Sequence, residues 1–116
     1  MEAANILMVE DDESIRALVL SILGDLGHRV QSAETAEQGL ALFDQGLFDV
    51  VLSDVNLPGV DGIEMVRRIR RSDPTVVPVI MTARRDQQTA VSALECGVRS
   101  FLMKPFSRDD LEVRID

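Results

Sequence analysis

Residues 50–54 read Val-Val-Leu-Ser-Asp, an apolar run that stops at a carboxylate. A strand that is apolar throughout must be covered on both faces, as the inner strands of a parallel sheet are. Apolar runs of similar length, each followed by polar residues, recur at residues 6–9, 76–81 and 100–103. We therefore expect a parallel β-sheet whose two faces are both covered by helices.

Helical patterns separate these runs. From Ile15 to Leu26, apolar residues recur at helical spacing, and Gly27 follows where a helix C-terminus favours glycine. The half-polar residues 29–33 are typical of an edge strand. Capping residues then predict three further helix starts, and a thinner apolar pattern predicts a fourth helix. These helices are expected from Thr35 to near Gly46, from Asp61 through Ile69, from about Asp86 to Cys96, and from Ser107 through Ile115.

Five strands alternating with five helices predict a doubly wound α/β fold. The weak second strand and the short fifth strand suit the two edges, which gives the flavodoxin-like strand order 2-1-3-4-5. The chain of 116 residues fits one domain, residues 1–116. Its short last helix is compatible with a natural chain that continues beyond Asp116.

Composition narrows the class of protein. The formal net charge of −8 argues against a nucleic-acid-binding surface, which would be basic. No apolar run approaches the roughly 20 residues that span a bilayer, and the N-terminus lacks signal-peptide features. The single cysteine, Cys96, rules out an intramolecular disulfide and is expected to be buried, whereas His28 is expected in a solvated turn. These features favour a cytoplasmic protein without membrane contact.

Polar residues stand at the ends of four predicted strands. Asp11 and Asp12 follow the first strand, Asp54 the third, Thr82 the fourth and Lys104 the fifth. Singly, each has a plainer interpretation, since an Asp just before a helix is more often a cap than a ligand. Together they converge on the sheet edge where open α/β folds bind ligands. Clustered carboxylates repel one another unless a cation is present, and magnesium is a cation that carboxylates bind. A magnesium ion together with a lysine is suited to phosphoryl transfer.

The sequence resembles the receiver domain of two-component response regulators, the family that includes the bacterial chemotaxis receiver. The resemblance covers the whole chain and rests on four motifs in the family's order and spacing. They are Glu10-Asp11-Asp12, residues 54–62 (Asp-Val-Asn-Leu-Pro-Gly-Val-Asp-Gly), Met81-Thr82-Ala83 and Lys104-Pro105-Phe106.

The resemblance implies that Asp54 accepts a phosphoryl group from a phosphohistidine on a histidine kinase or a histidine phosphotransfer protein. The implied cofactor is Mg²⁺, or Mn²⁺ in its place. Asp12 would ligate the metal directly and Asp11 mainly through a water, with Asp54 and the backbone carbonyl of Asn56 as further ligands. The implied chemistry is self-catalysed transfer with slow autodephosphorylation, not that of a turnover enzyme.

Further roles are implied at the other strand ends. Thr82 would hydrogen-bond a phosphoryl oxygen, Lys104 would form an ion pair with it, and the Lys104–Pro105 peptide bond is expected to be cis. Asn56 and Arg84, each two residues beyond a site residue, flank the approach of the hydrolytic water and are expected to tune the lifetime of the phosphorylated state.

The signal is expected to leave through the fourth helix, the fifth strand and the fifth helix. The family places an aromatic switch residue three positions before the lysine, and here that residue is Phe101 in place of Tyr. Ordinary strand packing is the alternative interpretation of Phe101. An effector domain or downstream protein and a phosphorylation-dependent homodimer are compatible partners.

Three rival interpretations use the same architecture. A haloacid-dehalogenase-type phosphatase would carry its nucleophile after the first strand with a second Asp two residues on, whereas here Asp11 and Asp12 are adjacent. A flavin or nucleotide carrier would need a phosphate-binding loop after the first strand, which is missing from the sequence. A degenerate receiver that acts only as a binding module remains the third rival.

Overall fold

The computed structural model describes residues 3–83, 87–98 and 100–115, and in these residues five strands alternate with five helices. The strands are β1 (Asn5–Val9), β2 (Arg29–Ala33), β3 (Val50–Asp54), β4 (Val77–Thr82) and β5 (Ser100–Met103). The helices are α1 (Glu13–Asp25), α2 (Ala36–Gln45), α3 (Gly62–Ser72), α4 (Gln87–Glu95) and α5 (Arg108–Ile115).

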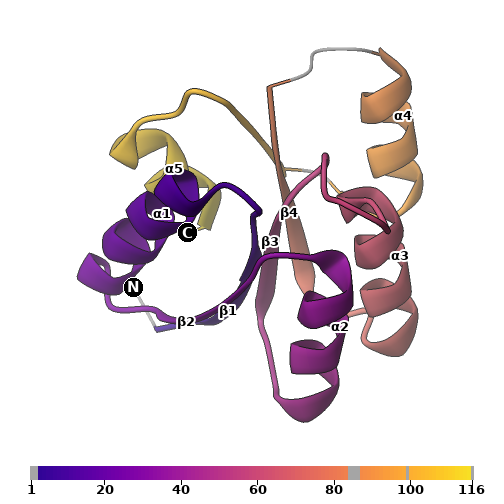
Figure 1. Ribbon diagram of the computed structural model, residues 1–116, viewed down its shortest axis with the longest axis horizontal. Coiled ribbons are helices and arrows are strands. Elements are labelled where there is room, and N and C mark those ends of the chain that lie inside the picture. Colours follow the sequence, from indigo (N-terminus) through magenta and orange to yellow (C-terminus); the bar gives the residue numbers. More distant parts are fainter. Residues whose placement is uncertain (1–2, 84–86, 99, 116) are drawn as a thin grey trace.

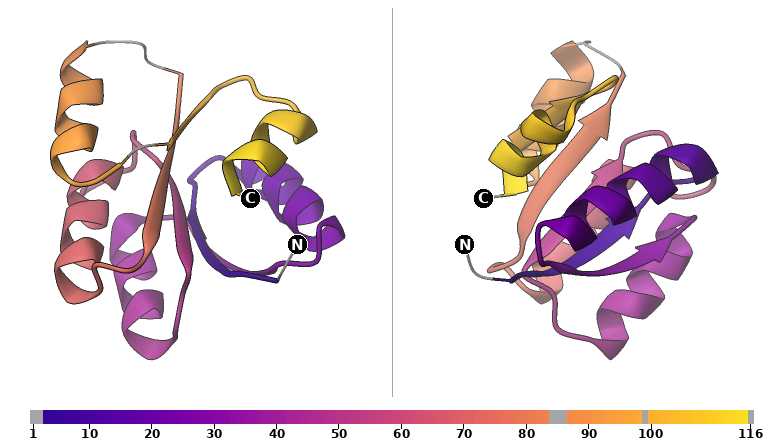
Figure 2. Two further views of the ribbon diagram at one scale, coloured as in Figure 1. Left: turned by 180° about the vertical axis from the view of Figure 1, so that it is seen from behind. Right: turned by 90° about the vertical axis from the view of Figure 1, so that its left-hand side faces the viewer.

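All five strands run parallel in one sheet, in the order β2-β1-β3-β4-β5. Helices α1 and α5 cover one face, and α2, α3 and α4 cover the other (Figures 1 and 2). The predicted strand order and two-sided helical cover are confirmed. Because every strand points the same way, the carboxyl ends of β1, β3, β4 and β5 meet at one edge of the sheet.

Two apolar cores hold these layers together, one on each face of the sheet. Successive β1 side chains alternate between them: Leu7 and Val9 pack with residues from α2 and α3, whereas Ile6 and Met8 pack with residues from α1 and α5. Each buried aliphatic side chain of this size contributes about 2 kcal/mol to stability. All five residues of β3 are buried, so the strand that carries Asp54 lies at the centre of the molecule.

Polar side chains fix the starts of four helices. Each accepts a hydrogen bond from the backbone N–H three residues further on, an arrangement worth about 1 kcal/mol per helix. The capping residues are Asp12, Thr35, Asp61 and Ser107. The predicted helix starts at Thr35, Asp61 and Ser107 are thus confirmed.

Strand ends differ from the predictions by a residue at most, whereas α3 continues to Ser72, three residues beyond Ile69. The fourth strand begins at Val77, not Val76, and Asp54 is the last residue of β3 and not the residue after it. The expected start of the fourth helix at Asp86 lies outside the described residues. Within the part of the chain that is described, no helix has both the length and the apolar character needed to cross a membrane.

His28 is buried, not solvated as predicted. It lies in the connection between α1 and β2 with only 7% of the residue exposed, and its Nδ1 accepts a hydrogen bond from the backbone N–H of Ala4 at 3.0 Å. The parallel pairing of β1 with β2 brings the imidazole beside the start of β1. Cys96 is buried as predicted, and its thiol donates to the carbonyl of Ala93.

Gly62 lies against the backbone of the central strand. Its N–H donates to the carbonyl of Val55 at 3.0 Å, and a Cβ placed on it would come within 1.9 Å of the Asp54 carbonyl oxygen. The buried Ser53 hydroxyl donates to that same oxygen at 2.9 Å. The position therefore requires glycine, and the close approach of the start of α3 fixes the peptide group of Asp54.

We expect Gly62→Ala to lower the free energy of unfolding by about 3 kcal/mol, because the added methyl group displaces backbone and not a flexible side chain. Gly24→Ala is the matched control, since a Cβ there meets nothing within 4 Å. In helix α1 it should raise the free energy of unfolding by about 0.5 kcal/mol. Urea denaturation measures both, and equal effects of the two substitutions would contradict the packing described for Gly62.

Candidate functional site

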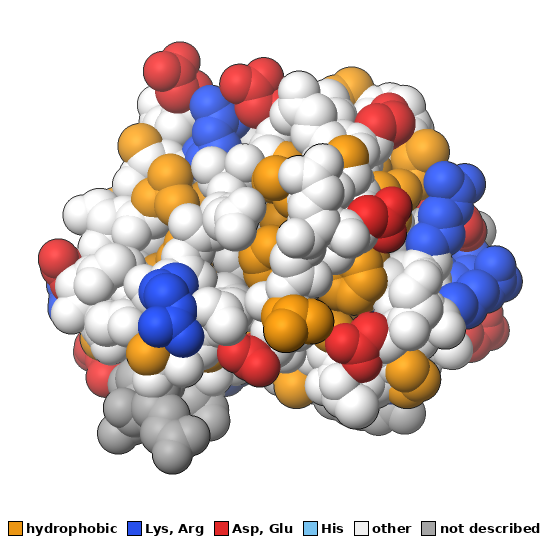
Figure 3. Space-filling model, turned by 90° about the horizontal axis from the view of Figure 1, so that it is seen from below, with side chains coloured by type: hydrophobic (Ala, Val, Ile, Leu, Met, Phe, Trp, Pro, Cys, Tyr) orange, Lys and Arg blue, Asp and Glu red, His pale blue; other side chains and the backbone are white. Residues whose placement is uncertain are grey.

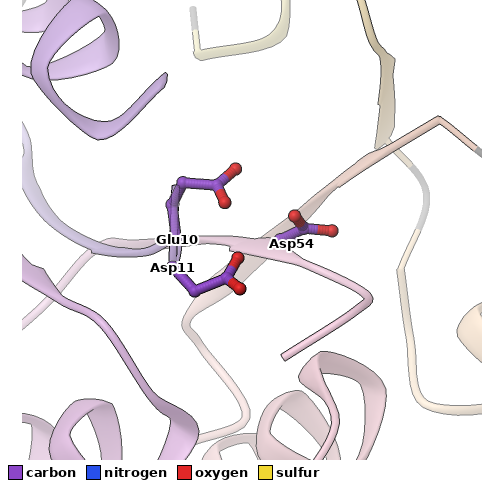
Figure 4. A group of neighbouring side chains, drawn as sticks. All are labelled: Glu10, Asp11 and Asp54. Carbon is purple, nitrogen blue, oxygen red and sulfur yellow. The ribbon is translucent and has the colours of Figure 1, made fainter. Parts of the chain in front are cut away.

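Three carboxylates gather at the carboxyl ends of β1 and β3. Glu10, Asp11 and Asp54 each place one carboxylate oxygen within 4.8 Å of the others (Figure 4). Glu10 is fully buried, Asp54 is nearly so, and Asp11 is exposed. The group thus opens to solvent on the Asp11 side. On the face seen from below in Figure 3, acidic side chains are instead spread among basic and apolar ones.

Lys104 joins two of these carboxylates from the end of β5. Its Nζ donates to Glu10 Oε1 at 2.6 Å and to Asp54 Oδ2 at 2.7 Å, with 16% of the lysine side chain exposed. Burial by itself would lower the pKa of Lys104, but the hydrogen bonds that its ammonium donates to Asp54 and Glu10 outweigh this effect, and the pKa is raised. The lysine is therefore a firmly protonated counter-ion to both acids.

Burial raises the pKa of Glu10 above its ordinary value, and the nearby charge of Asp54 adds to this effect. Hydrogen bonds from the Lys104 ammonium and from the backbone N–H of Asp12 act in the opposite direction. Glu10 Oε2 accepts this second bond at 3.0 Å, so both of its oxygens have partners. These bonds hold the Glu10 carboxylate in place on the buried side of the site.

Asp12 was predicted to ligate the metal directly, but it lies at the start of α1 and outside the group formed by Glu10, Asp11 and Asp54. Its Oδ1 accepts from the backbone N–H of Ile15 at 3.0 Å, which makes it the N-cap of α1. The carboxylate that joins Asp11 and Asp54 is Glu10. The sequence interpretation missed Glu10, although the preference of Asp for the residue before a helix was a signal that Asp12 is a cap.

Thr82 and Asn56 lie at the same edge of the sheet as Asp54. Thr82 is the last residue of β4, is 2% exposed, and its carbonyl accepts from the N–H of Lys104 at 2.8 Å. Asn56 donates its backbone N–H to Asp54 Oδ1 at 3.0 Å, and its own side chain is exposed. The site residues from β3, β4 and β5 are thus brought together as predicted, whereas Arg84 lies outside the described residues.

The Lys104–Pro105 peptide bond is cis, as the resemblance implied. Phe101 is partly buried and packs against the core that lies under α2, α3 and α4. The guanidinium of Arg114 donates to the Phe101 carbonyl at 2.9 Å, which ties α5 to β5. This placement is compatible with both interpretations of Phe101, switch residue and ordinary strand packing.

The donor set fits a hard divalent cation. Glu10, Asp11 and Asp54 offer carboxylate oxygens from one small volume, and oxygen is the donor that Mg²⁺ and Mn²⁺ prefer. Because Asp11 is exposed, the open side leaves room for the waters that Mg²⁺ retains. The residues present therefore suit the implied ion.

The family model of the response regulator receiver domain matches residues 6–116. The chain belongs to this family, the receiver domains of response regulators, which are signalling proteins of two-component systems. Among solved structures, chemotaxis protein CheY4 of Vibrio cholerae superposes with a TM-score of 0.93 at 29% identity, covering 98% of this chain and 97% of that one. NtrX of Brucella abortus gives a TM-score of 0.89 at 35% identity, covering 97% of this chain and 26% of that one.

Curated relatives include the transcriptional regulatory protein AfsQ1 of Streptomyces coelicolor, which is 40% identical over 111 residues. This match covers 96% of the chain and 49% of AfsQ1. The transcriptional regulatory protein ZraR of Klebsiella oxytoca is 35% identical, with 98% of the chain and 26% of ZraR covered. The chain therefore spans half or less of the length of these relatives.

We expect Lys104→Met to raise the pKa of Glu10 further, because burial would then act without the ammonium that opposes it. With a raised pKa, the Glu10 carboxyl keeps its proton to higher pH in the folded chain than in the unfolded chain. The free energy of unfolding therefore falls as pH rises above 4.5, the ordinary pKa of this group. At neutral pH we expect a loss of about 3 kcal/mol. Carbon-detected NMR titration of the Glu10 carboxyl and urea denaturation measure the two effects.

Arg108→Met is the matched control for this substitution. It also removes an ion pair, but Arg108 and Asp25 are 50% and 63% exposed, so the loss should stay below about 1 kcal/mol. An unchanged Glu10 pKa in Lys104→Met would contradict the role of the ammonium as counter-ion.

Proposed function

We propose that Asp54 is the phosphoryl acceptor of this receiver domain and that a phosphohistidine on a histidine kinase or histidine phosphotransfer protein is the donor. The observation that carries the proposal is the position of the Lys104 Nζ, 2.7 Å from Asp54 Oδ2 and between the two buried acids of the group, Glu10 and Asp54. An ammonium at this position can form an ion pair with a phosphoryl group on Asp54 and neutralise the charge of that group.

In the proposed transfer, a carboxylate oxygen of Asp54 attacks the phosphorus atom of the phosphohistidine. A P–O bond forms as the P–N bond breaks, and the leaving imidazole nitrogen takes the electron pair and then a proton from solvent. Lys104 and the Thr82 hydroxyl bind the phosphoryl oxygens. The carboxylate needs no general base, so positioning and charge neutralisation by these residues do most of the work.

Glu10, Asp11, Asp54 and the backbone carbonyl of Asn56 are the proposed holders of Mg²⁺ or Mn²⁺. The bound ion would supply positive charge to the phosphoryl oxygens. Asp12, which the sequence analysis placed in direct contact with the metal, is assigned in this proposal to capping α1, because Glu10 and not Asp12 lies in the acidic group with Asp11 and Asp54. The proposed acidic pair is therefore Glu10 with Asp11.

A protein donor has a surface beside the acceptor on which to dock. An apolar depression of about 320 Å³ adjoins Lys104, and Leu18 in its lining is 51% exposed. Its lining residues are Ile15, Leu18, Ala83, Lys104, Pro105 and Phe106. An apolar patch next to a polar site suits a partner protein better than a small phosphate ester. This supports a phosphohistidine on a protein as the donor.

Phosphorylation is proposed to act through the surface of α4, β5 and α5. The added group carries roughly −1.5 to −2 charges and three acceptor oxygens, which the Thr82 hydroxyl can move to meet. Phe101 in β5 would then rotate toward the space that Thr82 leaves. Of the side chains described in α4, Ala93 alone is buried, so little apolar packing resists a shift of this helix. The proposed recipient of the signal is an effector domain or a separate protein.

We expect incubation with phosphoramidate or acetyl phosphate and Mg²⁺ to add one phosphoryl group to the chain, as measured by intact mass spectrometry. Asp54→Asn should abolish the gain, because an amide oxygen forms no stable acyl phosphate. Asp49→Asn is a matched control, since Asp49 directly precedes the same strand, at the end remote from Asp54, and accepts from the N–H of Asn5. A gain by Asp54→Asn equal to that of the unaltered chain would contradict the assignment, and so would no gain at all.

We expect beryllofluoride, which mimics a phosphoryl group on the acceptor, to change backbone amide exchange in α4 and β5 while β1 and β3 stay protected. The reason is that α4 is weakly packed and that β5, which carries Phe101, leads directly into Lys104, whose ammonium contacts the acceptor. Hydrogen–deuterium exchange with mass spectrometry measures the difference, with Asp54→Asn plus beryllofluoride as the control. Identical exchange in α4 and β5 with and without the mimic would contradict the proposed output surface.

A further inference from the structure

Arg16 of α1 binds the backbone of the acidic site and not a side chain within it. Its Nη1 donates to the carbonyl oxygen of Glu10 at 2.9 Å, and only 16% of the arginine side chain is exposed. Its other terminal nitrogen lies 3.5 Å from Glu34 Oε1, on a side chain that is 63% exposed. The arginine therefore joins the end of β1 to the segment between β2 and α2.

The contact from Arg16 completes the hydrogen bonding of Glu10. The Glu10 N–H donates to the carbonyl of Ala33 at 3.0 Å, and its two carboxylate oxygens accept from Lys104 and from the N–H of Asp12. The Glu10 carbonyl belongs to the peptide group that leads directly into Asp11. Since Asp11 is exposed, little packing orients it, and the fixed peptide plane before it is what sets its direction.

Two effects of Arg16 on a bound cation have opposite signs. As a positive charge near the acidic group, it would repel a divalent ion, and its removal would strengthen binding. As the group that orients the Glu10–Asp11 peptide, it would align two ligands, and its removal would weaken binding. Residues that orient metal ligands typically change metal affinity 10–100-fold. The Arg16 charge is partly offset by Glu34 and by the acids of the site, so the orienting effect should dominate.

We propose that Arg16 is a positioning residue for the divalent-cation site, which it serves by holding the carbonyl of Glu10 and thereby aligning Glu10 and Asp11. The inference rests on the cation site of the proposed function and assigns Arg16 no contact with the ion or with the phosphoryl group.

The test is isothermal titration calorimetry of the 116-residue chain with Mg²⁺ alone. Arg16→Met removes the donor at similar side-chain length and should weaken Mg²⁺ binding about tenfold. Arg16→Lys keeps one donor within reach of the carbonyl and should recover most of the affinity. Glu34→Gln removes the exposed ion pair but leaves the contact with Glu10, so its affinity should match that of the unaltered chain.

Arg108→Met is a further control, because it makes the same change of charge on α5, where the arginine pairs with Asp25. The amide NMR signals of Asp11 and Asp12 give a second measurement: without Mg²⁺, Arg16→Met should shift them and Glu34→Gln should not. If Arg16→Met does not fold, Arg16→Gln replaces it in the comparison with Arg16→Lys.

Unchanged or tighter Mg²⁺ binding by Arg16→Met overturns the proposal, and tighter binding would identify Arg16 as a source of repulsion. A loss in Glu34→Gln as large as in Arg16→Met also overturns it, since the ion pair would then account for the effect. The titration needs no phosphoryl donor. It can therefore contradict the role of Arg16 while intact mass still finds Asp54 phosphorylated, and the converse also holds.

Discussion

The ammonium of Lys104 between the carboxylates of Glu10 and Asp54 is the interaction on which the rest of the site depends. Glu10 is fully buried and the side chain of Asp54 is 9% exposed, and a buried carboxylate without a counter-ion costs several kcal/mol. The lysine directly follows β5, at an edge of the sheet, and reaches acids at the ends of β1 and β3. The charge arrangement thus holds only if the strands lie in the observed order and register.

The buried strand β3 and the contacts around it hold this arrangement of charges rigidly in place. β3 is buried along its whole length, and Gly62 and the Ser53 hydroxyl fix the carbonyl of Asp54 from two sides. Glu10 is held through its N–H, its carbonyl and both carboxylate oxygens. A site built in this way needs little reorganisation when charge arrives, which is how positioned groups contribute most to phosphoryl transfer.

Most of this could be predicted from the sequence, because apolar strands and capped helices leave strong patterns and parallel strands bring their ends together. The acidic run at residues 10–12 was harder. Its three carboxylates are consecutive, and which of them faces Asp54 depends on where β1 ends and α1 begins, to within one residue. Sequence patterns do not locate ends that closely. His28 was misplaced for a related reason: its burial arises from a contact with Ala4, which is remote in sequence.

The sparse packing of α4 has a consequence for how such a domain diversifies. Val91 and Leu94 are exposed on this helix, while Ala93 ties it to the core. Replacing exposed side chains costs little folding stability, because few buried contacts change. The exposed surface of α4 can therefore change almost independently of the strands beneath it, whose side chains are largely buried.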